Sequence, residues 1–222
     1  MALGRFVRCP SCGTLNRLAR ASCESCGAPM DARPSPEAPT DVRSEVEGLQ
    51  AWMRWWFHLG VTLLAAWMAL PYLTRPSHYG LLDYAILPFH EAGHYFLMPF
   101  APEFLVVAGG TLVQLGLPLG FALYFLLVRR EPFSACVAAF WLCASVQSMG
   151  LYMKDARFLL LPLFGADPLD GHDWNYLFGK MGLLHRSVEI GGFFQASGRV
   201  GMLAVLAGMG AWLLRHRPGR PG

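Results

Sequence analysis

Two histidines and a glutamate lie close together within an apolar stretch, residues 87–100, LPFHEAGHYFLMPF. On an α-helix, positions i and i+4 share a face, so the imidazoles of His90 and His94 could bind one zinc ion. Zinc lowers the pKa of a bound water to near neutrality. Glu91 could take the proton from that water and later pass it to a leaving amine. The spacing therefore predicts the site of a zinc hydrolase.

The alternative is that both histidines are ordinary core residues. A carboxylate within a membrane-length apolar run is costly and is by default functional. Glu91 is the only acidic residue between Asp83 and Glu103, and it stands between two residues of metal-ligand type. We therefore favour a metal site. Haem fits less well, because two histidines on one helix face cannot take opposite axial positions.

A catalytic zinc usually has three protein ligands and one open position, so a third ligand must come from elsewhere in the chain. Residues 167–174, DPLDGHDW, offer several carboxylates and one imidazole. A proline and a glycine there predict a non-helical backbone, which membrane depth tolerates only beside protein or a watery cavity. The residues alone leave Asp167, Asp170, His172 and Asp173 open as the third ligand.

An H-E-x-G-H in a hydrophobic segment, followed by Leu-Asp-Gly after a proline-containing loop, resembles the site-2 protease family of intramembrane zinc metalloproteases. The resemblance covers mainly residues 84–175. It implies that His90 and His94 bind zinc, that Glu91 is the catalytic base and that Asp170 is the third ligand. The asparagine that the family has before its prolines is missing here.

The stretch GHDWNYLFGKMGLL, residues 171–184, also resembles a signature of little-characterised bacterial membrane proteins that share the H-E-x-G-H. That kinship implies His172 or Asp173 as the third ligand instead. We rank Asp170 first, His172 second and Asp173 third.

A tetrahedral intermediate needs a hydrogen-bond donor for its oxyanion. Gln114 and Asn175 are the first candidates, followed by Gln147 and Arg157. For both glutamines, hydrogen bonding between neighbouring membrane helices is the simpler interpretation.

A second constellation lies near the amino terminus, in residues 9–27, CPSCGTLNRLARASCESCG. Cys9 and Cys12 form one C-x2-C pair, and Cys23 and Cys26 form another ten residues later. Two such pairs, each followed by a glycine that permits a tight turn, can hold one structural zinc ion tetrahedrally. The stretch resembles a zinc ribbon of the small bacterial kind.

The four arginines near these cysteines make the ribbon mildly basic. No aromatic platform accompanies them, so nucleic acid is an unlikely partner. We expect a docking or regulatory module for a protein partner.

The composition indicates which elements position these residues. Of 222 residues, 54% are hydrophobic and only 15% are charged, which is typical of an integral membrane protein rather than a soluble domain. We expect an all-α polytopic membrane protein with about 4–6 transmembrane or re-entrant helices and a small N-terminal zinc ribbon. The long apolar segments are residues 55–73, 84–100, 103–128, 133–153 and 188–214, and a shorter, re-entrant one is 158–174.

We divide the chain into a zinc ribbon (1–30), a proline-containing flexible linker (31–50), a membrane-embedded metalloprotease-like domain (51–215) and a basic tail (216–222). No signal peptide is visible, so we expect a cytoplasmic ribbon attached to a bacterial inner membrane. If the segment 84–100 dips into the bilayer without crossing it, the arginines obey the positive-inside rule.

The predicted function is hydrolysis of peptide bonds in transmembrane protein substrates, with one catalytic and one structural zinc ion. The alternative is a catalytically inactive, protease-like scaffold or adaptor that binds zinc structurally. A metal transporter is less favoured, because only one polar cluster interrupts the apolar segments.

Overall fold

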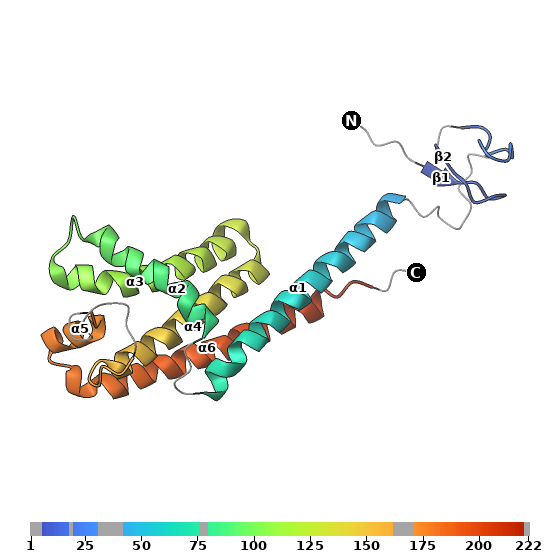
Figure 1. Ribbon diagram of the computed structural model, residues 1–222. Helices are drawn as coiled ribbons and strands as arrows, with labels where there is room; N and C mark the ends of the chain where they lie inside the picture. Colours follow the sequence, from blue (N-terminus) through green and yellow to red (C-terminus); the bar gives the residue numbers. More distant parts are fainter. Residues whose placement is uncertain (1–5, 18–19, 31–41, 76–79, 162–170, 220–222) are drawn as a thin grey trace. The chain divides into compact units, whose positions relative to one another are not determined.

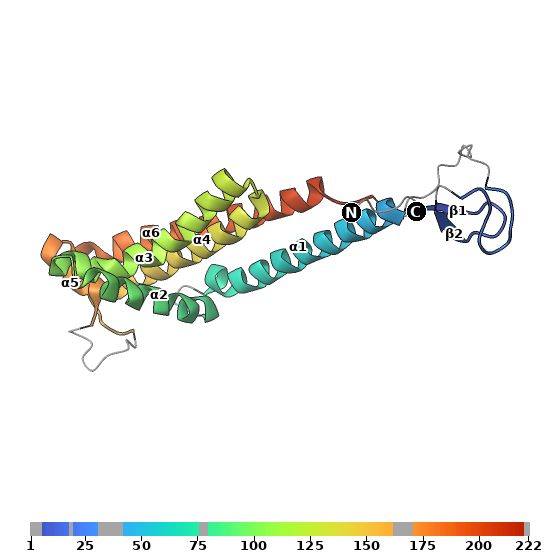
Figure 2. The same cartoon turned by 90° about the horizontal axis from the view of Figure 1, so that it is seen from above.

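The computed structural model describes residues 6–17, 20–30, 42–75, 80–161 and 171–219, which are mostly helical. The chain divides into two compact units, one made of Met1–Phe57 with His216–Gly222 and the other of His58–Arg215. Figures 1 and 2 show the elements of each unit from two directions.

The amino-terminal unit contains a two-stranded antiparallel sheet, with β1 at Phe6–Arg8 and β2 at Leu15–Arg17. Val7 pairs with Asn16 at the centre of the register. Each cysteine pair closes a tight turn, in which the amide of the following glycine donates to the carbonyl of the first cysteine at 2.9–3.0 Å. Gly13 and Gly27 end these turns with φ values of 74° and 70°, a left-handed conformation that favours glycine.

The second unit is helical. Its elements are the carboxyl-terminal part of α1 (Val42–Thr74), α2 (Leu81–Leu97), α3 (Glu103–Leu123) continued by the π-helical η1 (Tyr124–Arg129), α4 (Pro132–Asp155), α5 (Asp173–Met181), the 3-10 turn η2 (Leu184–Arg186) and α6 (Ser187–Arg215). Four stretches are long and apolar enough to cross a membrane: Glu45–Thr74, Glu103–Arg129, Pro132–Asp155 and Leu184–Arg215. The prediction of a mostly helical chain with helices of membrane length is confirmed, and these helices indicate an integral membrane protein.

Helix α2 has 17 residues and is not among the four span-length helices, which is compatible with a segment 84–100 that enters the bilayer without crossing it. One boundary differs from the sequence-based expectation. Helix α1 begins at Val42, inside the range 31–50 that the composition assigns to a linker. Its start has a physical reason, because Pro39 is the last proline before it and the following residues include the good helix formers Glu45 and Glu47. Most of the short segment 158–174, including residues 162–170, lies outside the described residues.

Helix α4 forms the centre of the bundle, with 56% of its apolar window buried against 17–22% for the other three. It lies alongside α6 in both views (Figures 1 and 2). Glycines make this approach possible, since a Cβ at Gly150 would lie 2.6 Å from the carbonyl oxygen of Gly191. A Cβ at Gly198 would lie 2.6 Å from the backbone nitrogen of Gln147. Small residues that let backbones meet are typical of helix contacts in membranes.

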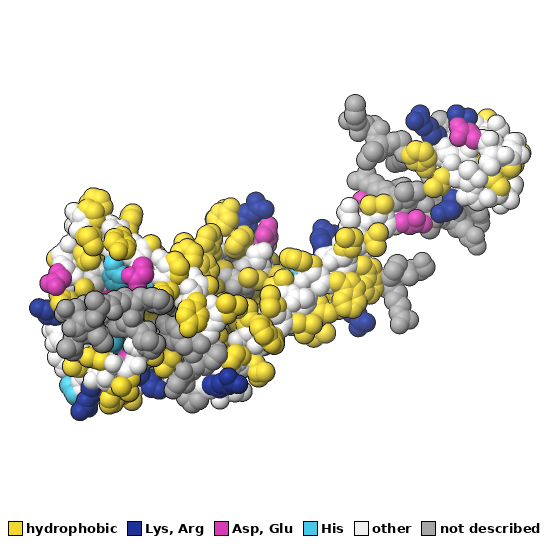
Figure 3. Space-filling model, in the orientation of Figure 1, with side chains coloured by type: hydrophobic (Ala, Val, Ile, Leu, Met, Phe, Trp, Pro, Cys, Tyr) yellow, Lys and Arg dark blue, Asp and Glu magenta, His cyan; other side chains and the backbone are white. Residues whose placement is uncertain are grey.

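The helical unit buries polar groups and exposes apolar ones. Among its described residues, the buried polar side chains come from several helices: Asp83, His90, Thr111, Gln114, Ser145, Gln147, Ser148, Asp155, His172, Ser187 and Gln195. Large apolar side chains such as Leu63, Trp67 and Leu126 are exposed, and hydrophobic side chains cover much of the visible helical surface (Figure 3). Exposure of so much apolar surface to water is unfavourable, so this surface is suited to contact with lipid.

Candidate functional site

Helix α2 carries the H-E-x-G-H residues, and its inward face presents His90 and His94 toward α3. The helix start is fixed by Asp83, whose Oδ2 accepts hydrogen bonds from the Gly80 amide (2.6 Å) and the Tyr72 hydroxyl (2.8 Å). The two imidazole rings lie 4.9 Å apart between centroids, as the i, i+4 spacing predicts.

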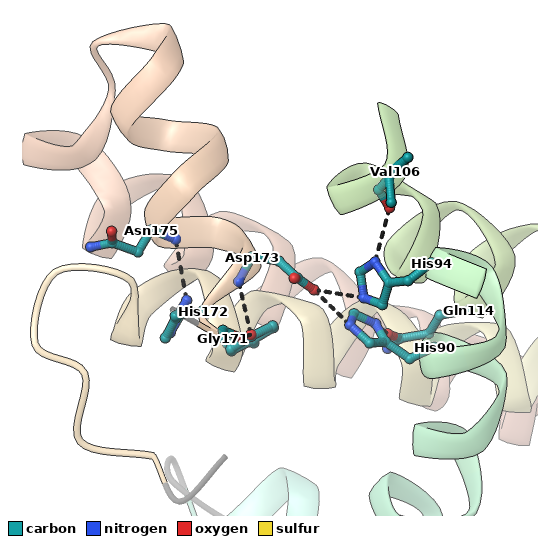
Figure 4. Close-up of polar contacts among 9 residues, drawn as sticks. His90, His94, Val106, Gln114, Gly171, His172, Asp173 and Asn175 are labelled. Carbon is teal, nitrogen blue, oxygen red and sulfur yellow. Dashed lines mark hydrogen bonds and ion pairs between the residues drawn. The ribbon is translucent and has the colours of Figure 1, made fainter. Parts of the chain in front are cut away.

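Each imidazole is oriented by a hydrogen bond from its Nδ1 (Figure 4). Nδ1 of His90 lies 2.9 Å from Oε1 of Gln114, and Nδ1 of His94 lies 2.9 Å from the carbonyl oxygen of Val106. Both partners are oxygens that can only accept, so both Nδ1 atoms donate. The amide nitrogen of Gln114 donates in turn to the carbonyl of Ser145 at 3.2 Å, which fixes the amide's orientation. The Nε2 atoms are therefore left with lone pairs, as metal ligands require.

The third group at this point is Asp173, the first residue of α5. Its Oδ2 lies 2.7 Å from Nε2 of His90 and 3.3 Å from Nε2 of His94. A carboxylate in the first turn is stabilised by the positive end of the helix dipole. Burial alone would raise the pKa of the Asp173 carboxyl, but when the histidines are protonated in the absence of a metal, their hydrogen bonds and charges outweigh it, so the pKa lies below its ordinary value. Asp173 is therefore an anion at neutral pH.

The donor atoms fit a metal ion. One ligand atom each from His90, His94 and Asp173 lies within 4.8 Å of the others. A single proton can bridge only one pair of these atoms, whereas a metal ion can accept all three lone pairs. Two imidazoles and one carboxylate are a donor set found in catalytic zinc sites, which keep a fourth position open.

Gly110 on α3 leaves the space that such an ion needs. A Cβ at this position would lie 2.5 Å from Nε2 of His94 and 2.6 Å from Nε2 of His90. Any side chain here would thus push against the Nε2 atoms of both imidazoles. Its neighbour Gly109 meets the backbone of Gly93 from α2, where a Cβ would lie 2.6 Å from the Gly93 oxygen. These two glycines set the close approach of α3 to the histidine face of α2.

A cavity of about 580 Å³ adjoins the three ligands. Glu91 lines it, together with the ligands and with residues of α2, α3 and α4, including Asp83, Tyr84, Leu87, Tyr95, Met98, Gln114, Ser148 and Tyr152. Glu91 itself is exposed to this space. The wall mixes apolar side chains with a few convergent polar groups, which is typical of a binding site.

His172 does not face the two histidines of α2. Its Nδ1 accepts the amide N–H of Asn175 at 3.2 Å and so caps the start of α5. The proton of the neutral ring then lies on Nε2, which faces Oδ2 of Asp155 at 3.4 Å. Burial lowers the pKa of His172 and keeps it neutral. Nδ1 is thus occupied within the protein, whereas the buried Nε2 lies near Asp155 without forming a hydrogen bond.

The other predicted residues take the following places. Asp170 lies outside the described residues. Gln114 holds the His90 ring, as described above. Asn175 donates from its side chain to the carbonyl of Ala156 at 2.7 Å, which ties α5 to the end of α4. Asp173, ranked third from the sequence, is the residue that the structure brings to the histidine pair. The sequence signal for it was the stretch GHDWNYLFGKMGLL, which implied His172 or Asp173.

The four ribbon cysteines form a second cluster. Their sulfur atoms lie within 4.8 Å of one another, with Cys9 and Cys26 3.6 Å apart and Cys12 and Cys23 also 3.6 Å apart. Four thiolates at this spacing could hold a metal ion such as zinc.

The buried Asn16 supports the ribbon cluster from β2. Its side chain donates to the sulfur of Cys23 at 3.4 Å and accepts the amide of Glu24 at 2.8 Å. The amides of Cys26 and Ser25, with Asn16, lower the pKa of Cys23 to about 6. Donors of this kind around a thiolate are what a metal-binding cysteine requires.

Comparisons with models of protein families, with characterised proteins and with solved structures give no significant match.

Proposed function

We propose that this protein is a zinc-dependent peptidase that hydrolyses peptide bonds of membrane protein substrates, similar in its chemistry to the site-2 protease family. The observation that carries the proposal is the convergence of Nε2 of His90, Nε2 of His94 and Oδ2 of Asp173 beside a cavity lined by Glu91. The three residues would hold the zinc ion, with Asp173 as the third ligand.

Each residue has a separate part in the reaction. Zinc, when bound, supplies a Lewis acid that lowers the pKa of a water molecule to near neutrality. Glu91 takes a proton from the attacking water and delivers it to the leaving amine. The Nδ1 atoms of His90 and His94 would donate to Oε1 of Gln114 and to the carbonyl of Val106, which would keep the rings oriented with Nε2 toward the metal.

The surroundings favour an apolar substrate. The four apolar helices support a polytopic arrangement in the membrane, with the cavity inside the helical unit. Leu87, Tyr95 and Met98 give its wall apolar contact area next to Glu91. A transmembrane segment of another protein, locally unwound so that its peptide bonds are accessible, has the matching chemistry.

The ribbon would carry the second, structural zinc ion. Its four cysteines are arranged around one point, and Thr14, Asn16 and backbone amides of the same unit contact their sulfur atoms. We assign it a role in binding a protein partner. Four cysteines used as metal ligands rather than as disulfides favour a reducing, cytoplasmic location for it.

The test uses the full-length protein in detergent or lipid nanodiscs with a set of apolar transmembrane peptides, and mass spectrometry detects cleavage. Wild type should cleave at least one peptide, and Glu91→Gln should keep its zinc content but lose about 10²–10⁴-fold in rate. Equal rates in wild type and Glu91→Gln would refute the peptidase assignment. Two zinc ions in both proteins, with no cleavage by either, would instead support the inactive scaffold.

A further inference from the structure

The third ligand sits on a short stretch of non-helical backbone. Gly171 and His172 precede α5, and His172 has φ −98° and ψ 95°, an extended conformation. The carbonyl of His172 accepts the first hydrogen bonds of α5, from Asn175 and Tyr176, but the Gly171 carbonyl and the Asp173 amide are not part of that helical pattern. Nevertheless Asp173 must be held to within a few tenths of an ångström if it is to serve as a metal ligand. Some other part of the structure must therefore hold this stretch.

Tyr152 of α4 contacts the backbone on both sides of His172. Its hydroxyl donates to the carbonyl oxygen of Gly171 at 3.3 Å and accepts the amide N–H of Asp173 at 3.1 Å. One phenol oxygen thus satisfies a backbone acceptor and a backbone donor that no regular element would satisfy. The second bond reaches the metal-ligand residue itself, through its own backbone nitrogen.

The ring of Tyr152 adds a second contact to the same stretch. It lies against the His172 imidazole, with centroids 4.2 Å apart and planes tilted by 31°. It also lines the cavity, 6.1 Å from the His90 ring. Its position therefore links the α2 side of the site to the α5 side.

Helix α4, which carries Tyr152, is closely packed. Leu151 and Met153, the neighbours of Tyr152, are buried, and α4 is held against α6 where Gly150 and Gly191 meet. A side chain on the best-packed helix of the unit can set the position of a less regular segment. Helix positions locate a site more precisely than loops do.

We infer that Tyr152 is a positioning residue that fixes Asp173 for metal binding by bridging the Gly171 carbonyl and the Asp173 amide. This inference rests on the proposed function, since it assumes that Asp173 is a zinc ligand. Tyr152 acts through Asp173 and does not need to touch the substrate. Both hydrogen bonds of its hydroxyl described above are made to the backbone.

The test is Tyr152→Phe in the full-length protein, which removes both hydrogen bonds and keeps the ring against His172. Outer-shell partners of metal ligands typically contribute 10–100-fold to metal affinity, so the affinity of the membrane-domain site for zinc should fall by about this factor. The matched control is Tyr124→Phe. Tyr124 lies on η1 of the same unit, does not line the cavity, and its hydroxyl has no hydrogen-bond partner among the described residues.

The measurements are zinc content per chain in buffers of fixed free zinc, melting temperature, and peptide cleavage at saturating zinc. We expect Tyr152→Phe to lose the second zinc ion at higher free zinc than Tyr124→Phe does, with an unchanged melting temperature, and to recover cleavage when zinc is saturating. Ribbon zinc provides an internal standard, because neither tyrosine belongs to that unit.

Two results would overturn the inference while leaving the proposed function intact. One is zinc affinity in Tyr152→Phe equal to that of wild type. The other is cleavage that stays lost at saturating zinc, which would make Tyr152 a catalytic residue. A wild-type protein that binds zinc only in its ribbon would refute the proposed function and this inference together.

Discussion

Replacing Gly110 by alanine is the sharpest perturbation of the site that the structure offers. The added methyl carbon would lie 2.5 Å from Nε2 of His94 and 2.6 Å from Nε2 of His90, whereas ordinary van der Waals contact begins at 3.4 Å. One or both rings must therefore move by about 0.9 Å, the difference between 3.4 and 2.5 Å. Metal–ligand distances tolerate about 0.2 Å. We expect zinc affinity at this site to fall by about 100-fold or more.

The assay is zinc content against free zinc, read together with melting temperature. Gly116→Ala is the matched control on the same helix, because a Cβ there meets nothing within 4 Å. It should keep the second zinc ion and gain slightly in stability, since alanine favours a helix over glycine by about 0.5–1 kcal/mol. Overpacking at Gly110 should cost about 1–3 kcal/mol of stability, which is measured separately. A Gly110→Ala protein with two zinc ions at wild-type affinity would refute the reasoning.

Two further predictions concern residues that support ligands. Gln114→Leu removes the acceptor for His90 Nδ1, so the zinc affinity of the membrane-domain site should fall about 10–100-fold, while Gln114→Glu should retain binding. Zinc titration measures both affinities. A Gln114→Leu affinity equal to that of wild type would contradict the role of Gln114 in orienting His90. In the ribbon, the lowered pKa of Cys23, about 6, means that its thiolate is kept above that pH and lost as the pH falls through it. Asn16→Ala removes one N–H donor to this sulfur, so zinc release on acidification should begin at higher pH than in wild type. A colorimetric zinc indicator measures the pH at which half of the zinc is released. An unchanged half-release pH would contradict a stabilising role of the Asn16–Cys23 hydrogen bond.

Sequence alone could predict those features that depend on local spacing. The ribbon needs only two short turns and four cysteines, so its pattern is complete within residues 9–27. The relation of His90 to His94 follows from helix geometry, and span-length apolar helices follow from composition. These features need no knowledge of how distant segments pack.

The third ligand and the glycine cradle depend on tertiary packing. Asp170, His172 and Asp173 stand within four positions, and a turn of the backbone decides which of them points to the histidines. Asp173 is 83 positions from His90, and its backbone contact with Tyr152 could not be read from spacing. In the same way, the sequence predicts only that Gly110 permits close helix packing. The register of α3 on α2 is what places it against the imidazoles.

The most direct test of the account is the zinc content of the purified full-length protein, prepared without chelators, for wild type and for Asp173→Asn, His172→Asn and Asp170→Asn. The account predicts two zinc ions per chain in wild type, one in Asp173→Asn, and two in each of the other variants. His172→Asn should keep its zinc because asparagine also caps a helix start. Two ions retained in Asp173→Asn, or only the ribbon ion in wild type, would contradict the claim that His90, His94 and Asp173 form a metal centre.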